Sequence, residues 1–214
     1  MRLANEIPNW VQNNVSDGIL DALSKTYYHN TIYNWTYSLL IILGAVLIAR
    51  AIYWGTKKFG KVLVSRTKSK LDDLLLDKME EPVVFGIVVI GLWWGVDRLD
   101  FPEAAHGFIG NTFQVLIAID ITWFVARTID ALIEQYLLPR VQKTEGDLDD
   151  QLLPILRKGL RTIIWIIGII VGLNNAGYNV SALLAGVGIG GLAMAMAAKD
   201  FVANIFGGVT VFVD

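Results

Sequence analysis

Two apolar residues near the end of the chain have a spacing that suits the exclusion of ions. Leu192 and Met196 stand four positions apart in a stretch, residues 162–198, that contains no charge, so they share one face of a helix. Where copies of such a helix surround an axis, these side chains form stacked apolar rings. A narrow apolar ring blocks ions by dewetting. The spacing therefore predicts a hydrophobic gate at Leu192 and Met196.

A charged pair follows the two apolar residues. Lys199 lies three positions after Met196 on the same face, and Asp200 lies about 100° further round the helix. Lys199 is thus expected at the inner mouth of a pore. Asp200 is expected to point to a neighbouring copy and to form an ion pair with Lys199 of that copy. The alternative is that both side chains extend to the membrane interface, because the pair lies at that depth.

Other ionisable residues interrupt apolar stretches further upstream. Asp120 is a functional candidate, since an acid inside a membrane is costly. A hydrogen bond between helices would explain it equally well, and both interpretations stay open. Arg50 and Arg127 fall at the inner ends of spans, where we expect them to reach lipid phosphates.

Enzymatic chemistry is not expected. The sequence has no nucleophile and base pair, no phosphate-binding glycine loop and no metal-ligand spacing, so we predict neither catalytic residues nor a cofactor or metal. His29 and His106 are too few for a metal site. A net charge of −2 argues against nucleic-acid binding.

The composition places these residues in a membrane. Hydrophobic residues make up 54% of the 214 residues and charged residues 18%, with 7 Trp, 7 Tyr and 20 Gly. This predicts an all-α protein with several spans. Five spans are expected, the fourth and fifth being divided by turn-forming residues at 174–179. The first four spans and the start of the fifth are placed at 32–54, at 82–99 with Pro82 as the first helical residue, at about 111–138, from 162 and from about 180.

The distribution of basic residues gives an orientation. Twelve Lys and Arg residues fall in the connections 55–81 and 139–161, which the positive-inside rule places in the cytoplasm. The N-terminus is then outside and the C-terminus inside. Residues 1–31 read as an external amphipathic helix, because Ile7, Trp10, Val11, Val15, Ile19 and Leu23 recur at helical spacing.

An internal repeat divides the middle of the chain. A shift of 77 residues superposes Arg50 on Arg127 and Thr67 on Thr144, and it also superposes Gly91 on Gly168 and Gly95 on Gly172. This predicts two parallel hairpins, 32–110 and 111–179, before the last helix at 180–214. The other interpretation is that the LDDxLL motif of both units arose twice.

The last helix is rich in small residues on several faces. A ring of identical helices needs two small flanks on each copy, one for each neighbour. A helix at the centre of a monomeric bundle would have the same composition, so both arrangements stay open. The packing candidates are Ala185, Gly186, Gly188, Gly190, Gly191, Ala193, Ala195 and Ala197. At 34 residues the helix would be about 50 Å long, so a bend is expected near 199–200.

At these residues the chain resembles a known family. The segment GIGGLAMAMAAKDFVANIFGGVTVFVD is similar to the pore helix of the small-conductance mechanosensitive (MscS-like) channel family, and TEGDLDDQLLPILRKGLRTIIWIIGIIVGLNNAGYNVSALLAG is similar to the sequence that precedes it there. The match covers residues 144–214. The earlier spans resemble members with additional sensor helices.

The resemblance implies a homoheptamer in the bacterial inner membrane. Its pore would open under membrane tension and protect against osmotic stress. By the same resemblance Leu192 and Met196 match the constriction, and Asp200, Gly207 and Gly208 match the hinges. Asp200 replaces the usual kink glycine, and Met196 replaces a leucine. The family's cytoplasmic vestibule of β and α/β structure is not expected within these residues. A secondary transporter and a non-conducting membrane scaffold are the alternative functions.

Overall fold

The computed structural model describes residues 7–60, 70–141 and 147–213. It divides the chain into two units, Met1–Ala176 and Gly177–Asp214, and we describe each by itself. Thr67 and Thr144, which the repeat aligns, lie outside the described residues.

The N-terminal segment differs from the single amphipathic helix that we predicted. It forms two short helices, α1 (Asn9–Asn14) and α2 (Asp17–Ser24). Val15 is extended between them, and Ser16 has the extended backbone of an N-cap residue. Serine is a favoured N-cap residue, although the Ser16 side chain makes no capping hydrogen bond here.

A small hairpin that the sequence did not reveal connects α2 to the first long helix. Its strands β1 (Thr26–Tyr27) and β2 (Asn30–Thr31) are antiparallel, and the turn between them holds Tyr28 and His29 at φ 48° and 64°. A positive φ is costly for a residue that has a side chain. The turn is held by Asn30, whose buried amide donates to the carbonyl of Asp100 at 2.9 Å and accepts from its N–H at 2.7 Å.

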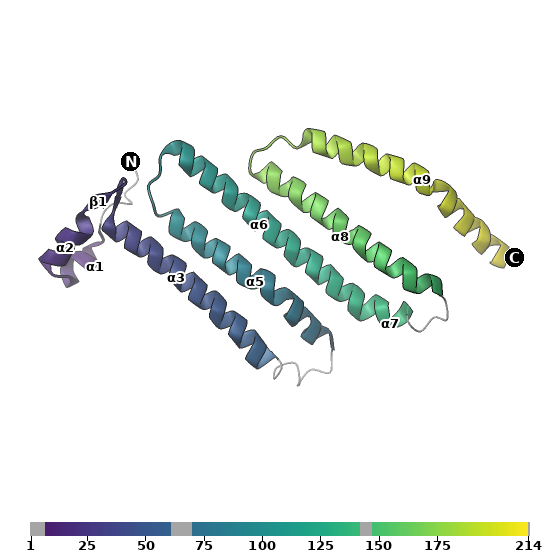
Figure 1. Cartoon of the computed structure of the whole chain (residues 1–214), viewed down its shortest axis with the longest axis horizontal. Coiled ribbons are helices and arrows are strands. Elements are labelled where there is room, and N and C mark those ends of the chain that lie inside the picture. The colour runs from purple at the N-terminus through teal and green to yellow at the C-terminus, as the bar shows by residue number, and fades with distance from the viewer. Residues whose placement is uncertain (1–6, 61–69, 142–146, 214) are drawn as a thin grey trace. The chain divides into compact units, whose positions relative to one another are not determined.

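Four long helices make up the rest of the first unit. Figure 1 shows α3, α5, α6 and α8 side by side, and α3 packs on α5, α5 on α6, and α6 on α8. Short π-helical segments extend α3 and α6 at their C-terminal ends. The bounds are α3 Ile32–Gly55, η2 Thr56–Gly60, α5 Lys70–Val96, α6 Glu103–Leu132, η3 Ile133–Leu137, α7 Leu138–Val141 and α8 Asp147–Asn175.

Several predicted boundaries were wrong. Pro82 does not begin a helix but lies buried inside α5, twelve residues after its start. The amphipathic run before Pro82 joins the helix because its leucine, lysine, methionine and glutamate residues are good helix formers. Residues 70–81 and 147–161, which we had assigned to connections, are likewise helical.

The second unit holds a single long helix. The predicted break is confirmed: α8 ends at Asn175, Gly177 takes φ +82°, and α9 runs from Ser181 to Val213. Only glycine adopts that φ at low cost, which is why the helix stops there. Lys199, Asp200, Gly207 and Gly208 all lie within α9, and the bend remains a prediction.

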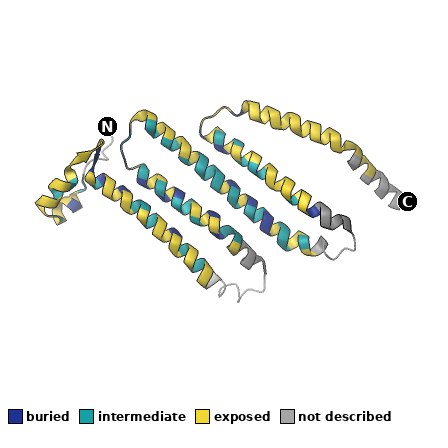
Figure 2. Ribbon diagram, viewed as in Figure 1, coloured by how far each residue is buried: buried dark blue, intermediate teal, exposed yellow. Residues whose placement is uncertain are grey.

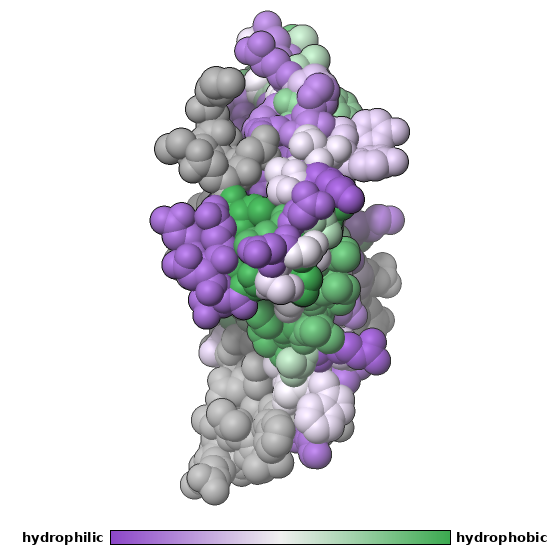
Figure 3. All heavy atoms as spheres, turned by 90° about the vertical axis from the view of Figure 1, so that its left-hand side faces the viewer, coloured by the Kyte–Doolittle hydropathy of each residue, from purple (hydrophilic) through white to green (hydrophobic). Residues whose placement is uncertain are grey.

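The helices have the length and composition of a membrane protein. Among the described residues, three stretches are long and apolar enough to span a bilayer: Ile32–Lys58, Asp77–Val96 and Ser181–Asn204. Large apolar side chains are exposed along them, including Leu40, Leu47 and Ile90. Figure 3 shows apolar residues gathered in the middle of one face, with hydrophilic residues at its margins. The structure therefore agrees with an all-α membrane protein.

Candidate functional site

The backbone reproduces the internal repeat. The π-helical segments Thr56–Gly60 and Ile133–Leu137 superpose under the shift of 77 residues that the sequence indicated. The same shift superposes the last residues of α3 and α6, Gly55 and Leu132. Two independent LDDxLL motifs would not bring π-helical turns into register. We therefore treat α3, η2 and α5 as the first hairpin, and α6, η3 and α8 as the second.

Glycine contacts inside the two hairpins follow the same register. A Cβ atom on Gly91 would lie 2.0 Å from the Cβ of Ala45, and one on Gly168 would lie 2.0 Å from Oγ1 of Thr122. Ala45 and Thr122 are themselves equivalent in the repeat. Each hairpin is thus closed at the same point by a glycine against a small residue, which lets the two backbones approach closely.

Ion pairs join the helices near the π-helical segments. Glu134 of η3 accepts a hydrogen bond from Lys78 of α5 at 2.5 Å and another from Arg157 of α8 at 3.3 Å. Arg157 also donates to the buried Asp130 at 2.9 Å, and Arg161 lies 2.7 Å from the same carboxylate. The hydrogen bond to Asp130 raises the pKa of Arg157.

Arg127 does not extend freely to lipid phosphates as we expected. It forms an ion pair with Glu81 of α5, lies over the ring of Trp123, and donates to the carbonyl of Lys78 at 3.2 Å. That carbonyl is free because Pro82, four residues later, has no N–H to donate to it. The interior proline of α5 thus creates an acceptor that the arginine of α6 uses.

The ion pairs fall into two groups. Lys78 to Glu134 and Glu81 to Arg127 join the two hairpins, whereas the remaining pairs lie inside the second hairpin. We call all of these residues the inner ion-pair network: Lys78, Glu81, Arg127, Asp130, Glu134, Arg157 and Arg161. The sequence analysis counted several of them only as basic charges of connections. Their partners were not visible, because the residues of each inter-hairpin pair are 46 and 56 positions apart.

The charges reverse sign between the repeats. Lys57 in the first hairpin is equivalent to Glu134 in the second, and Glu80 is equivalent to Arg157. The two hairpins therefore share a backbone but carry different charges near their π-helical segments.

Asp120 packs between the hairpins and makes no helix-capping contact there. Its Oδ2 lies 2.5 Å from the position of a Cβ on Gly86 of α5, and its Oδ1 is buried without a hydrogen-bond partner among the described residues. Both interpretations of Asp120 stay open, since only Oδ1 is known to lack a partner among the described residues. Asp120 stays a candidate intramembrane charge.

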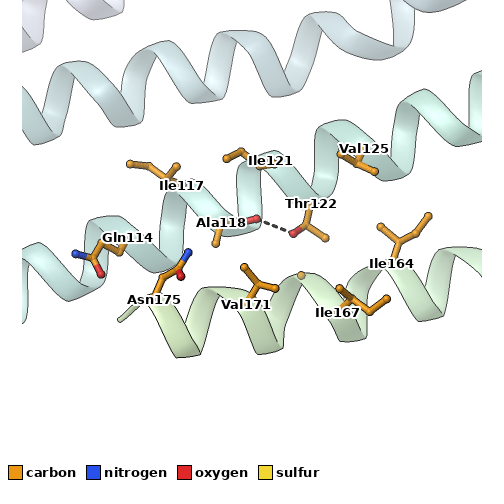
Figure 4. Close-up of a pocket in the computed structure, with 11 residues that line it drawn as sticks. Gln114, Ile117, Ala118, Ile121, Thr122, Val125, Ile164, Ile167, Val171 and Asn175 are labelled. Carbon is orange, nitrogen blue, oxygen red and sulfur yellow. Dashed lines mark hydrogen bonds between the residues drawn. The ribbon is translucent and has the colours of Figure 1, made fainter. Parts of the chain in front are cut away.

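An apolar groove of about 710 Å³ lies between α6 and α8. Figure 4 shows isoleucine and valine side chains along it, with the amides of Gln114 and Asn175 near one end. The hydroxyl of Thr122 is satisfied by the carbonyl of Ala118 at 2.6 Å, so it adds little polarity to the groove.

The predicted gate residues are exposed on α9. Leu192 and Met196 are 63% and 70% exposed, and Figure 2 shows α9 exposed wherever its burial is described. Lys199 and Asp200 are exposed as well. A Cβ on Gly186, Gly188, Gly190 or Gly191 would meet nothing within 4 Å. Within its own unit α9 has no neighbouring helix, so its small residues meet no side chain there.

Comparisons with known proteins cover both hairpins and α9. A family model described as "Mechanosensitive ion channel, transmembrane helices 2/3" matches residues 158–199, which include Leu192, Met196 and Lys199. No solved structure matches the chain.

Relatives align over most of the chain. It is 30% identical over 197 residues to the large-conductance mechanosensitive channel MscMJLR of Methanocaldococcus jannaschii, which covers 92% of this chain and 55% of the relative. The small-conductance channel MscMJ of the same organism is 30% identical over 192 residues, 90% of this chain and 55% of the relative. An MscS family protein of Bacillus subtilis, YhdY, is 29% identical over 179 residues, 82% of this chain and 47% of that protein. The chain spans about half the length of these relatives, and over that shared region it belongs to the MscS-like family of mechanosensitive channels.

Proposed function

We propose that this chain forms a homo-oligomeric ion channel that membrane tension opens, with α9 as the pore-lining helix. The observation that carries the proposal is the run of small residues on several faces of α9, because an apolar helix of this composition needs close neighbours. A ring of α9 helices supplies those neighbours on both flanks of each copy. The channel family model matches this helix as far as residue 199.

The gate in this proposal is a pair of apolar rings. Leu192 and Met196 face the axis and exclude ions from the closed pore by dewetting. Lys199 lies on the same face just below them and forms an ion pair with Asp200 of the neighbouring subunit. The helix bends near these two residues and again near Gly207 and Gly208, so that the part after Asp200 lies closer to the membrane plane.

Tension acts through the two hairpins. With five spans in each subunit, α3, α5, α6 and α8 face lipid around the pore helices. Tension favours the state that occupies more area in the membrane plane, and the hairpins transmit that bias to α9. Seven subunits, a bacterial inner membrane, an external N-terminus and protection against osmotic stress belong to the proposal through the family resemblance and the positive-inside rule.

The test is patch recording from liposomes that contain the purified full-length protein. Stepwise conductance that rises with suction is expected, whereas liposomes without protein should stay silent under the same suction. Silence of the protein across the tension range that the patch survives would refute the channel. Solute uptake that depends on a gradient, without conductance steps, would favour a transporter.

A further inference from the structure

We infer that the inter-hairpin pairs of the inner ion-pair network couple the two hairpins, so that they move as one body when tension changes. The inference rests on the proposed function for its meaning in gating. Its structural basis is independent of that function. Two ion pairs, and one hydrogen bond from the Arg127 side chain to a main-chain carbonyl, join α5 to α6 and η3 at one end of the interface.

Glu134 is the shared member of the coupling. Its carboxylate accepts from Lys78 of the first hairpin and from Arg157 of the second at the same time. Separation of the hairpins would break the ion pair between Lys78 and Glu134. Both side chains are only partly exposed, at 24% and 34%. Partly desolvated charges lose more on separation than exposed ones.

Arg127 adds a second link of different chemistry. It binds the Glu81 side chain and the Lys78 main-chain carbonyl that Pro82 leaves free. A guanidinium that holds a side chain and a backbone group of one helix resists both sliding and rotation of that helix, because its donors have a fixed planar arrangement. The first hairpin is thereby fixed to α6 at two neighbouring points of α5.

The repeat shows that these links are specific to this interface. Under the shift of 77 residues, Glu81 corresponds to Lys158 and Arg127 corresponds to Arg50. The equivalent contact between α8 of one subunit and α3 of another would therefore oppose two cations. The charges favour attachment of the first hairpin to the second hairpin of its own chain.

Coupling predicts a change in the slope of open probability against tension. An ion pair that only stabilises one state would not change that slope. The logarithm of the open-to-closed ratio rises with tension in proportion to the difference in area between the two states. If the first hairpin is released, its share of that area difference is lost and the slope becomes shallower. Loss of a contact that merely stabilises the closed state would shift the midpoint and leave the slope unchanged.

The experiment compares charge variants in tension-clamped patches. Lys78→Glu places a carboxylate opposite Glu134, and Glu81→Arg places a guanidinium opposite Arg127. The variant with both substitutions should therefore show a shallower slope of open probability against tension at unchanged unitary conductance. Exchange of one pair, Glu81→Arg with Arg127→Glu, should restore the slope at least in part. Arg161→Gln is the matched control, because among the described residues Arg161 pairs with Asp130 alone, inside the second hairpin, and Asp130 keeps Arg157. An unchanged slope in the combined variant would overturn the coupling while leaving the channel intact.

A second measurement does not depend on conduction. Spin labels at positions 58 and 158, one in each hairpin, report the distance between the inner ends when labelled subunits are diluted into unlabelled ones. The distance distribution should broaden in the combined variant and stay narrow in Arg161→Gln. An equally narrow distribution in the combined variant would contradict the coupling even if the wild-type protein conducts no current. Size-exclusion chromatography verifies that each variant assembles, and Lys78→Gln with Glu81→Gln replaces the combined variant if it does not.

Discussion

The guanidinium of Arg127 donates a 3.2 Å hydrogen bond to the main-chain carbonyl of Lys78, 49 residues earlier in the chain. In an ordinary helix that carbonyl would accept from the residue four positions later, which here is Pro82. A proline in the middle of a helix normally leaves an unsatisfied acceptor. In this chain the acceptor becomes a point of attachment between two helices.

The hairpin that precedes α3 should depend on Asn30. Asn30→Ala removes both hydrogen bonds to Asp100 and leaves its N–H unpaired, so we expect a loss of about 1–3 kcal/mol in unfolding free energy. Denaturation of the purified protein in detergent measures it. Asn13→Ala, at an exposed position of α1, is the control and should change little. Equal stability of the two variants would argue against the contact.

Close packing within the second hairpin should make Gly168 intolerant of a methyl group. Gly168→Ala places a Cβ 2.0 Å from Oγ1 of Thr122, and overpacking of this kind costs about 1–3 kcal/mol. Gly159→Ala in the same helix is the matched control, since its Cβ would meet nothing within 4 Å. There we expect no loss, or a gain of up to about 1 kcal/mol. Melting curves that rank the two variants in the opposite order would contradict the packing.

A ring of α9 helices predicts cross-links between subunits. Cysteines at Gly188 and Ala195, on the small-residue flanks, should yield ladders of higher oligomers on oxidation in membranes, and the longest ladder counts the subunits. The chain has no cysteine of its own, so the background is clean. Products no larger than a monomer would exclude the ring.

The apolar gate predicts a gain of function for a polar substitution. Leu192→Ser should hydrate the constriction, lower the opening tension and slow the growth of cells that express it. Leu183 lies nine residues earlier, about 180° round the helix, so Leu183→Ser is a control of the same chemistry that faces away from the axis. If the control lowered the threshold as much as Leu192→Ser, the gate would not be at Leu192.

The lysine ring predicts a selectivity change. If Lys199 lines the inner mouth, its charge favours anions modestly. Lys199→Glu should then shift the reversal potential in a salt gradient towards the value expected of a cation-selective pore. The closed state should also loosen, because the new carboxylate repels Asp200. A reversal potential that does not move would place Lys199 at the membrane interface instead.

The sequence predicted features that depend on local composition or on comparison of the chain with itself. The break at 174–179 followed from turn formers, and Gly177 indeed takes a positive φ. The repeat followed from matched glycines, and the structure places Gly91 and Gly168 in equivalent contacts. Such features are readable because their cause lies within a few residues or recurs at a fixed spacing.

The features that sequence analysis missed depend on distant partners. The sequence indicated a helix start at Pro82 because proline prefers the first turn of a helix. That preference is local, whereas the arginine that binds the freed carbonyl lies in another helix. The acidic partners of Lys78 and Arg157 were invisible for the same reason. The hairpin turn at Tyr28 and His29 runs against local preference, and the hydrogen bonds from Asn30 to Asp100 that hold it span 70 residues.

The order of packing along the chain has a consequence for biosynthesis. Each long helix of the first unit packs on the helix that precedes it, so the contacts that build this unit join neighbours in the sequence. Topologies with short contact separation fold quickly, and the pieces of such a chain form as they emerge from the ribosome. The first hairpin can therefore close on Gly91 before the second is synthesised. Attachment at Lys78 and Glu81 must wait until α6 and η3 have been synthesised, so the first hairpin closes before it is fixed to the second.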